Sequence, residues 1–462
     1  MKKTTRKRTI ALVSTLAMLL AIAIPAFGVT ASAAESETYN HYYGLLHAHT
    51  GNSDGVLDYR DAFDMARYEA GCDFFACTEH AEVFCTGLDT DPGRWERGRK
   101  VAQNLTENGK FVAITGYEIT WPDSVGPNLY GHMNGFNTKD YYSAENPRYA
   151  NKEDGSGPQN YFDDFAKLEG AIGQFNHPFS LVFGNFHDFA YWTPERDENM
   201  NLIEVANGIS PVLLFDFAGF ARTRTLATYV RFEREFNAAL SKGWHLGPTN
   251  NQDNHNASWG TANNHRTVLL AKELTRSALY DAMANRRVYA TEDKNMKVDF
   301  TINGEVMGTI LDHSPSELNV SVKASTSTAN IGRIELIGEN GRVVKAKTFL
   351  SKTAQWDFTI PAEHKHYYIK IGPSFTFTAP IWVKDNCRVI FDTDKTAQPA
   401  TVRRGEPVAK PADPVQKGAS FLGWYVNGND IETFAGMAGA FSMSRETVMN
   451  NKFLFQMMGK LF

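Results

Sequence analysis

Cysteine is scarce in this sequence, with four residues among 462. They are Cys72, Cys77, Cys85 and Cys387, and no Cys-x-x-Cys pair occurs. A zinc site built from thiolates is therefore not expected, because such sites use closely spaced cysteine pairs. If the chain is exported, two disulfides are an alternative. The apolar surroundings of Cys72 and Cys77 instead favour a role for these cysteines as small core residues.

The sequence also has no excess of positive charge. Lys and Arg number 47 against 52 Asp and Glu, so the formal net charge is -5. A nucleic-acid partner is not expected, since binding to a phosphate backbone favours a basic face. The remaining composition, 42% hydrophobic and 21% charged, is typical of a soluble globular protein. The length predicts more than one domain.

A long apolar run occurs only near the N-terminus. Basic residues precede the stretch Thr9–Ile24, and Ala31-Ser32-Ala33 follows it. This order predicts a signal peptide over residues 1–34, cleaved after the small residues. An uncleaved anchor is the alternative, because the stretch is near the lower spanning limit of about 17 residues. We expect a secreted or cell-surface protein, although no Leu-Pro-x-Thr-Gly sequence supports covalent attachment to a cell wall.

Short apolar strands alternate with amphipathic helices from Tyr42 to about Asp293. This alternation predicts a parallel sheet, and over about 250 residues a (β/α) barrel is the natural architecture. We place this domain at residues 35–295. The expected helices are Tyr59–Ala70, Arg222–Lys242 and Arg276–Arg286, and the expected strands include Asp73–Thr78, Phe111–Thr115, Ala171–Phe175 and Leu202–Ala206.

The pattern changes after Asp293 to short strands separated by turns such as Asn303-Gly304. It predicts a small all-β sandwich over residues 296–386. Beyond it, the segments Val389–Asp392, Gly405–Val408 and Phe421–Tyr425 resemble the Listeria–Bacteroides repeat, a small β-grasp-like module of bacterial surface proteins. The resemblance covers residues 387–434 and implies cell-envelope association, with an ordinary β-hairpin unit as the alternative.

The last residues, 435–462, depart from that repeat. They are rich in Met and Gly, without the closing strand that the repeat should have. We interpret them as an atypical tail, which indicates either an altered reading frame or a divergent terminal helix.

Histidines and carboxylates follow the expected strands in a recurring order. His47 and His49 are two residues apart, so on a strand both imidazoles project to one side and can share a cation. Gly55 lets the next loop turn back, which allows Asp54 to reach a neighbouring cation. His80 follows an apolar strand, where an imidazole without a partner is costly to bury.

Later strand ends supply further candidate ligands. Glu118 can bridge two cations about 3.5–4 Å apart, and His132 and His177 would complete the shell of the second. Asp253 and His255 add a carboxylate and an imidazole at alternate positions of one loop. This mixture, without cysteine, predicts two or three divalent cations and favours zinc, manganese or iron over calcium.

A centre of this kind is typical of metal-dependent hydrolases. A hydroxide bridging the cations, which lower the pKa of water to about 7, would attack phosphorus or a carbonyl carbon. We expect four ligands to carry this chemistry, namely His47, His49, Glu118 and Asp253. The candidates for substrate contacts are Asn207 at a strand end and the guanidinium groups of Arg222, Arg224 and Arg266, with a solvated or structural role as the alternative for each.

The segments that carry these ligands resemble the polymerase and histidinol phosphatase (PHP) superfamily. They are Leu46–Thr50, Ser53–Gly55, Thr78–His80, Gly116–Glu118, Asn176–Pro178 and Asp253–His255. Arg286–Thr291, followed by Asn303-Gly304 and Met307-Gly308, is similar to CehA/McbA-like members, and the similarity covers residues 40–384. The resemblance implies a distorted (β/α)7 barrel with a usually trinuclear metal site.

The resemblance also divides the nine ligands among three cations. One would be bound by His47, His49, Glu118 and Asp253, a second by Glu118, His132 and His177, and a third by Asp54, His80 and His255. Glu79 departs from the family pattern, which usually has Asp before this histidine. The departure concerns the groups around the ligands rather than the ligands themselves.

Together these features predict a secreted phosphoesterase that hydrolyses a small-molecule phosphate ester. The same ligands would also suit a carbamate or carboxylic ester hydrolase, because CehA/McbA-like proteins include such activities. A catalytically silent cell-surface binding protein is a third interpretation, against which the complete ligand set argues.

Overall fold

The computed structural model describes residues 38–85, 93–121, 130–150, 155–178, 184–209, 229–312, 315–383, 386–393, 396–403, 425–426 and 458–459. The predicted signal peptide, Arg222 and Arg224 lie outside these ranges, as does most of the predicted tail. None of the helices in the described ranges combines the length and apolarity that a membrane crossing requires.

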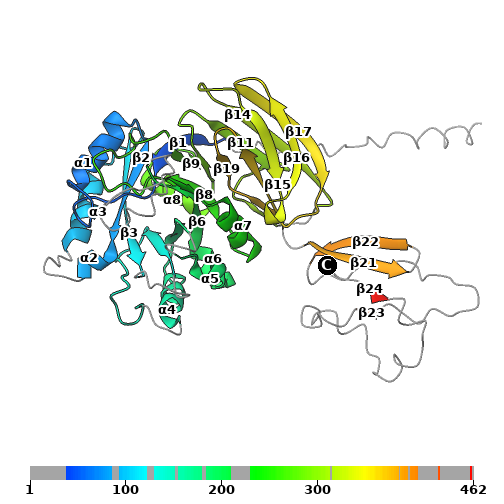
Figure 1. Cartoon of the computed structure of the whole chain (residues 1–462), viewed down its shortest axis with the longest axis horizontal. Coiled ribbons are helices and arrows are strands. Elements are labelled where there is room, and N and C mark those ends of the chain that lie inside the picture. The colour runs from blue at the N-terminus through cyan, green and yellow to red at the C-terminus, as the bar shows by residue number, and fades with distance from the viewer. Residues whose placement is uncertain are drawn as a thin grey trace, which may run out of the picture. The chain divides into compact units, whose positions relative to one another are not determined.

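A mixed sheet forms the framework of the first predicted domain, in the order β10-β9-β1-β2-β3-β4-β5-β6, with β8 also paired to β6 (Figure 1). Its strands are β1 (Asn40–Leu45), β2 (Phe74–His80), β3 (Val112–Thr120), β4 (His132–Phe136), β5 (Ile172–Asn176), β6 (Met200–Asn207), β8 (Gly247–Asn251), β9 (Arg266–Ala271) and β10 (Val288–Thr291). The curled sheet is consistent with a distorted barrel.

The prediction of a parallel sheet is confirmed only in part. β1, β2 and β3 are parallel, as are β5, β6 and β8, but β4, β9 and β10 run antiparallel to their neighbours. Only residues 121–131 separate β3 from β4, and a parallel crossover needs a dozen residues or more. The short connection therefore reverses the chain direction at β4.

Helices flank the sheet (Figure 1), and α1 (Tyr59–Asp64) shows how the sequence sets their limits. Asp58 and Asp61 form a reciprocal capping box at its start, and Tyr59 lies on its buried side. A π-helical turn, η1 (Met65–Glu69), continues it, and Gly71 follows at φ 65°, as the predicted C-terminal cap requires. The others are α2 (Ala81–Cys85), α3 (Gly93–Leu105), α4 (Ser156–Phe165), α5 (Phe186–Phe189), α6 (Pro194–Asn199), α7 (Glu233–Ser241) and α8 (Arg276–Ala284).

The prediction of one long helix over Arg222–Lys242 is wrong near the middle of this range. Only α7, Glu233–Ser241, is helical in its described part, and Val230–Arg231 forms β7, antiparallel to the end of β6. Pairing with β6 overrides the helical pattern of the sequence there, since tertiary contacts outweigh local propensity.

The large sheet continues into the predicted sandwich. β19 (Thr376–Thr378) pairs with β10, and β18 (His366–Ile371), β20 (Ile381–Val383), β13 (Ile310–Leu311), β15 (Gly332–Ile337) and β16 (Val343–Phe349) follow. A second sheet has the order β12 (Glu305–Val306), β11 (Lys297–Ile302), β14 (Glu317–Ser325), β17 (Thr353–Pro361). The predicted strands are confirmed, and the turn Asn303-Gly304 has two positive φ angles, which favour these residue types.

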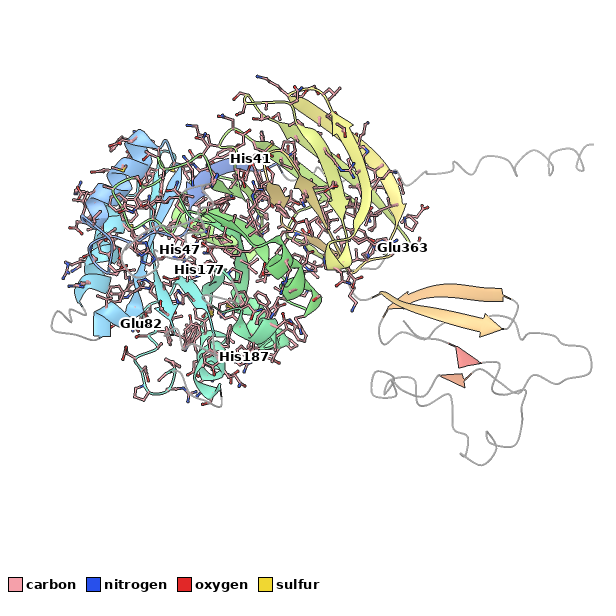
Figure 2. All side chains as sticks on the ribbon, in the orientation of Figure 1. His41, His47, Glu82, His177, His187 and Glu363 are labelled. Atoms are coloured by element: carbon pink, nitrogen blue, oxygen red, sulfur yellow. The ribbon has the colours of Figure 1, made fainter. Side chains whose placement is uncertain are left out.

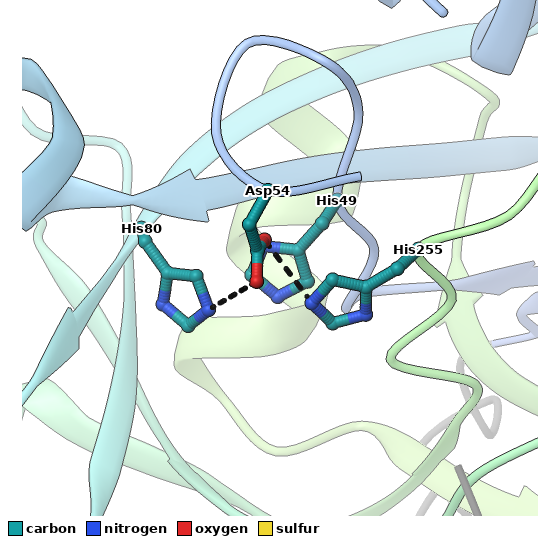
Figure 3. Close-up of side chains that lie close together, drawn as sticks. All are labelled: His49, Asp54, His80 and His255. Carbon is teal, nitrogen blue, oxygen red and sulfur yellow. Dashed lines mark ion pairs between the residues drawn. The ribbon is translucent and has the colours of Figure 1, made fainter. Parts of the chain in front are cut away.

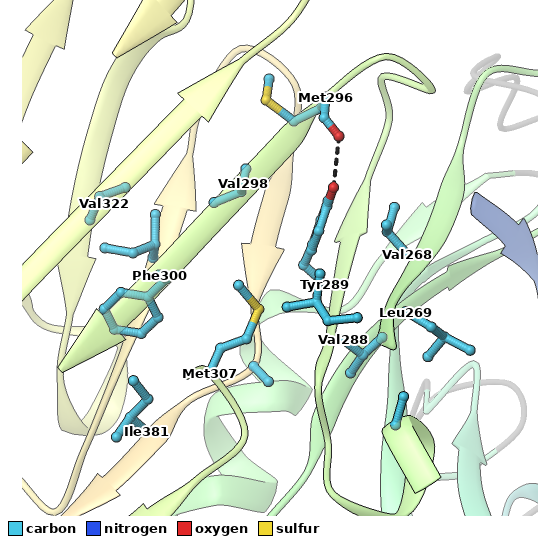
Figure 4. Packing of buried hydrophobic residues seen from close by; sticks show 14 of the residues in the cluster. Val268, Leu269, Val288, Tyr289, Met296, Val298, Phe300, Met307, Val322 and Ile381 are labelled. Atoms are coloured by element: carbon cyan, nitrogen blue, oxygen red, sulfur yellow. Dashed lines mark hydrogen bonds between the residues drawn. The ribbon is translucent and has the colours of Figure 1, made fainter. Parts of the chain in front are cut away.

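One hydrophobic core spans the boundary predicted near residue 296. Phe300 and Val298 of β11 pack in the same cluster as Val268 of β9 (Figure 4). The Tyr289 hydroxyl of β10 donates to the carbonyl of Met296, 2.8 Å away. The two predicted domains therefore share buried apolar surface.

We expect Phe300→Ala to lower the free energy of unfolding by about 3–5 kcal/mol, because it opens a cavity in this shared core. The loss should move a single thermal transition of both domains, followed by far-UV circular dichroism and tryptophan fluorescence. Lys297→Ala, an exposed change on the same strand, is the matched control. Two separate transitions, of which only one moves, would contradict the shared core.

The segments after residue 385 are described by their backbone alone. β21 (Asn386–Thr393) and β22 (Thr396–Arg403) form an antiparallel hairpin that includes Val389–Asp392, the first segment that resembles the repeat. β23 (Tyr425–Val426) pairs in parallel with β24 (Met458–Gly459). Gly405–Val408 lies outside the described residues, so the resemblance to the terminal repeat stays a prediction.

Candidate metal centre

The nine predicted ligands gather at one edge of the sheet. His80 ends β2 and Glu118 lies near the end of β3, while His177 directly follows β5. His132 is the first residue of β4, yet it reaches the same edge because β4 is antiparallel and pairs His132 with Thr120. The sheet thus brings together residues from distant parts of the chain.

Four overlapping groups of ligand atoms result, with all atoms of a group within 4.8 Å of one another. The groups are His47, His49 and Glu118; His47, His177 and Asp253; Glu118, His132 and His177; and His49, Asp54, His80 and His255. Every residue that the sequence predicted as a ligand belongs to at least one group.

The buried part of the centre converges on two histidines and two carboxylates. His47 Nε2 lies 3.2 Å from His49 Nε2, 3.4 Å from Glu118 Oε1 and 3.2 Å from Asp253 Oδ1. His49 Nε2 is 3.3 Å from Glu118 Oε2 and 3.1 Å from Asp253 Oδ1. His177 lies beside His47 (Figure 2), with its Nε2 3.4 Å from Glu118 Oε1.

The fourth group is the most open to solvent (Figure 3). Asp54 has a side chain 53% exposed, with one oxygen 3.2 Å from His255 Nε2 and the other 3.7 Å from His80 Nε2. The ring of His49 stacks on those of both His80 and His255, at centroid distances of 4.4 and 4.3 Å. His49 therefore faces the buried part with Nε2 and the open part with Nδ1.

The pKa values of the histidines differ between the buried and the open part of the centre. Burial would lower the pKa of His49, but Asp253 and Glu118 outweigh it and raise the value to about 10. The pKa of His47 is likewise raised well above its usual value, against burial, by these carboxylates and Glu204. Burial and the neighbouring His49 lower the pKa of His80 to about 3. Without cations, the buried part holds protons and His80 does not.

The donor set fits divalent cations. Glu204 accepts a hydrogen bond from His47 Nδ1, so the neutral ring carries a lone pair on Nε2, facing His49 and two carboxylates. Asp253 Oδ1 is buried and has no hydrogen-bond partner among the described residues. Imidazole nitrogens and carboxylate oxygens that converge in this way suit zinc, manganese or iron.

We expect metal binding to release about one proton or more at neutral pH, because the pKa values of His47 and His49 are raised in the metal-free chain and each ring must offer a lone pair on Nε2 to bind a cation. Calorimetric titration of the metal-free chain with Zn²⁺ in buffers of different ionisation enthalpy measures this number. The same number should fall in His49→Ala but not in His187→Asn, whose histidine lies outside the four groups. Zinc binding without proton release would contradict the protonation of these histidines in the metal-free chain.

The predicted substrate residues are placed less favourably than the ligands. Asn207 is buried and donates to Glu204 Oε2 at 2.7 Å. Arg266 is also buried, and its guanidinium donates to four backbone carbonyls, those of Ala70, Gly260, Asn263 and His265. Both side chains thus hold the structure around the centre, and Arg222 lies outside the described residues.

Two buried carboxylates lie beside the ligands, of which the sequence indicated Glu79 as a neighbour of the ligands and did not indicate Glu204. Glu204 contacts His47 and His177, and Glu79 contacts the loop that carries Asp54. Glu204 is the only acidic residue of β6, a strand whose every residue is buried. A lone acid in such a strand was the available signal, because a buried carboxylate needs donors around it.

Comparisons with known proteins add little. No family model and no curated protein matches the chain. Among solved structures, it is similar to a two-domain protein from Bacteroides vulgatus containing a predicted PHP-like metal-dependent phosphoesterase, at 17% identity and TM-score 0.39, covering 74% of this chain and 96% of that one. A candidate metal-dependent phosphoesterase from Bifidobacterium adolescentis has 13% identity and TM-score 0.27, covering 46% and 87%. Both similarities are too distant to show the family of this chain.

Proposed function

We propose that this chain is a metal-dependent phosphoesterase of the PHP type, CehA/McbA-like in its sequence. The observation that carries the proposal is the convergence of all nine His, Asp and Glu ligands in four overlapping groups. A silent scaffold would have no reason to keep buried carboxylates among buried imidazoles, since their desolvation is costly without cations.

Each group of ligands has a distinct task in this proposal. When bound, two or three divalent cations would activate water and neutralise charge on the substrate and leaving oxygen. Glu118 joins two of the three buried groups, because its Oε1 lies 3.4 Å from Nε2 of both His47 and His177. His49 joins the buried groups to the open one. Asp54 and His255 form the solvent-accessible side, where a substrate can enter.

Charge favours a phosphate ester over a neutral ester. Asp54, Glu118 and Asp253 bring three negative charges to the centre, and the buried Glu79 and Glu204 bring two more. Three divalent cations exceed these five charges by one, and a bridging hydroxide would balance that excess. Cations at this centre would bind and neutralise the anionic oxygens of a phosphate ester directly, and we therefore propose that the substrate is a phosphate ester.

Hydrolysis assays test the proposal directly. The full chain, with its metal content measured, is assayed with p-nitrophenyl phosphate, bis-p-nitrophenyl phosphate and p-nitrophenyl acetate, alongside His49→Ala and Asp253→Ala. Two or three bound cations and ligand-dependent cleavage of a phosphate are expected. Preferential cleavage of the acetate would favour the carbamate or carboxylic ester hydrolase, and folded protein without stoichiometric metal would leave only the surface-binding scaffold.

We also propose that the protein is exported and held at the cell envelope by residues 387–434. The N-terminal charge and apolar pattern supports export, and the resemblance to the surface repeat supports retention. Deletion of residues 387–462 should release the protein into the medium with hydrolysis unchanged. Loss of hydrolysis without release would contradict this division of roles.

A further inference from the structure

We propose that two buried carboxylates, neither of them a predicted ligand, control separate parts of the metal centre. Glu204 positions ligands of the two buried cation sites, and Glu79 positions the loop of the open site. The inference rests on the proposed function in so far as it presumes that cations bind.

Glu204 is surrounded by hydrogen-bond donors from four strands or strand ends. It is fully buried, with 0% of its surface exposed. Its Oε1 accepts from His47 Nδ1 and Asn251 Nδ2, both at 3.0 Å. Its Oε2 accepts from Asn207 Nδ2 and the His177 backbone N–H, both at 2.7 Å. A carboxylate suits this place because it only accepts and has about four lone-pair sites for the four donors.

These bonds fix two ligands at once. With Nδ1 of His47 donating to Glu204, Nε2 is left to face the buried cation site. The His177 backbone has φ 24°, a conformation that residues other than glycine rarely adopt. The bond from the His177 N–H to Glu204 holds it there, so Glu204 serves the groups of both His47 and His177.

Glu79 serves the other part of the centre. It is also 0% exposed, and accepts from the Thr50 backbone N–H at 3.0 Å and from the Thr50 hydroxyl at 2.6 Å. The Ser53 hydroxyl donates to its second oxygen. Thr50 and Ser53 flank the turn that ends at Asp54, whose own side chain is 53% exposed. The buried carboxylate therefore holds an otherwise exposed ligand loop in place.

The matched variants Glu204→Gln and Glu79→Gln separate the two roles. Glutamine keeps the shape but offers one acceptor oxygen and an NH2 group, which would face the donors that a carboxylate satisfies. Titration of the metal-free full chain with Zn²⁺ gives the number and affinity of sites, and ¹¹³Cd NMR gives one resonance for each site. We expect three sites in the unaltered chain.

Glu204→Gln should weaken two sites by about 10–100-fold and leave the third, whereas Glu79→Gln should weaken only that third site. The ¹¹³Cd resonances should divide in the same way, which general destabilisation would not produce. Asn207→Ala removes one donor to Glu204 and should cause a smaller loss at the same two sites, and it decides the matter should Glu204→Gln fail to fold.

Three sites in the unaltered chain, with equal weakening or none in both variants, would overturn this inference and leave the proposed function standing. An unaltered chain that binds neither Zn²⁺ nor Cd²⁺ would overturn both.

Discussion

Replacement of Glu118 by alanine is expected to slow phosphate ester hydrolysis by about a thousandfold or more, the equivalent of several kcal/mol of lost transition-state stabilisation. Glu118 is 1% exposed, and its two oxygens lie within 3.5 Å of nitrogens from five histidines. These histidines are His47, His49, His80, His132 and His177. No other ligand carboxylate of the described centre faces so many of them.

The loss should appear in kcat and in metal content together, because Glu118 belongs to two of the four groups. Steady-state kinetics and metal analysis of the purified variant measure both. Glu233→Gln is the control, since this carboxylate pairs with Lys370 outside the centre. A Glu118→Ala protein that keeps both full metal content and full activity would remove Glu118 from the mechanism.

The candidate ligands could be selected from the sequence because each depends on a local pattern. An apolar strand followed by a polar metal ligand marks a sheet edge, and His80 and His177 both follow this rule. His132 lies at the same edge for a different reason, because it is the first residue of a strand that runs antiparallel to β3. The sequence identifies such residues without showing which strands are neighbours or how they run.

The groups behind the ligands had no comparable pattern. Glu204 and His47 are 157 positions apart, and their hydrogen bond joins elements that only the folded sheet makes adjacent. Asn207 was correctly placed at a strand end, but its side chain turns to Glu204. A buried polar side chain points to the neighbouring group that needs a hydrogen bond. Which group is its neighbour is decided by the tertiary structure.

The predicted strands of the first domain match β2, β3, β5 and β6 in position, but the sandwich strands carry the clearer alternation of buried and exposed residues. β14 and β17 alternate buried and exposed residues, the period-two pattern that sequence analysis detects. The strands of the barrel-like sheet are buried on both faces, as β5 and β6 are, and carry no such alternation. Their directions therefore had to come from connection lengths and pairing.

The stability of the metal-free chain and the stabilisation that cations give should change with pH in opposite directions. In the metal-free chain, the pKa of His49 is raised from 6.5 to about 10. A raised histidine pKa contributes stability that is fully present below 6.5 and is lost as the pH rises towards 10. Glu118 and Asp253 have lowered pKa values, so their contribution is present above about pH 4–5 and is lost in acid.

The metal-free chain should therefore be most stable at about pH 5–6.5 and lose on the order of several kcal/mol towards alkaline pH. Cations bind the neutral imidazoles, so their stabilisation increases as the pH rises. The difference in melting temperature between loaded and chelated protein should widen by on the order of 5 °C from about pH 6 to about pH 9.

Thermal unfolding of the full chain with Mn²⁺ or with a chelator, at several pH values, measures this difference. His49→Ala should flatten its pH dependence, because the variant lacks the imidazole with the raised pKa. His187→Asn should leave it unchanged, and asparagine tolerates the positive φ of 52° at this position. A constant difference would mean that His47 and His49 are neutral before cations bind.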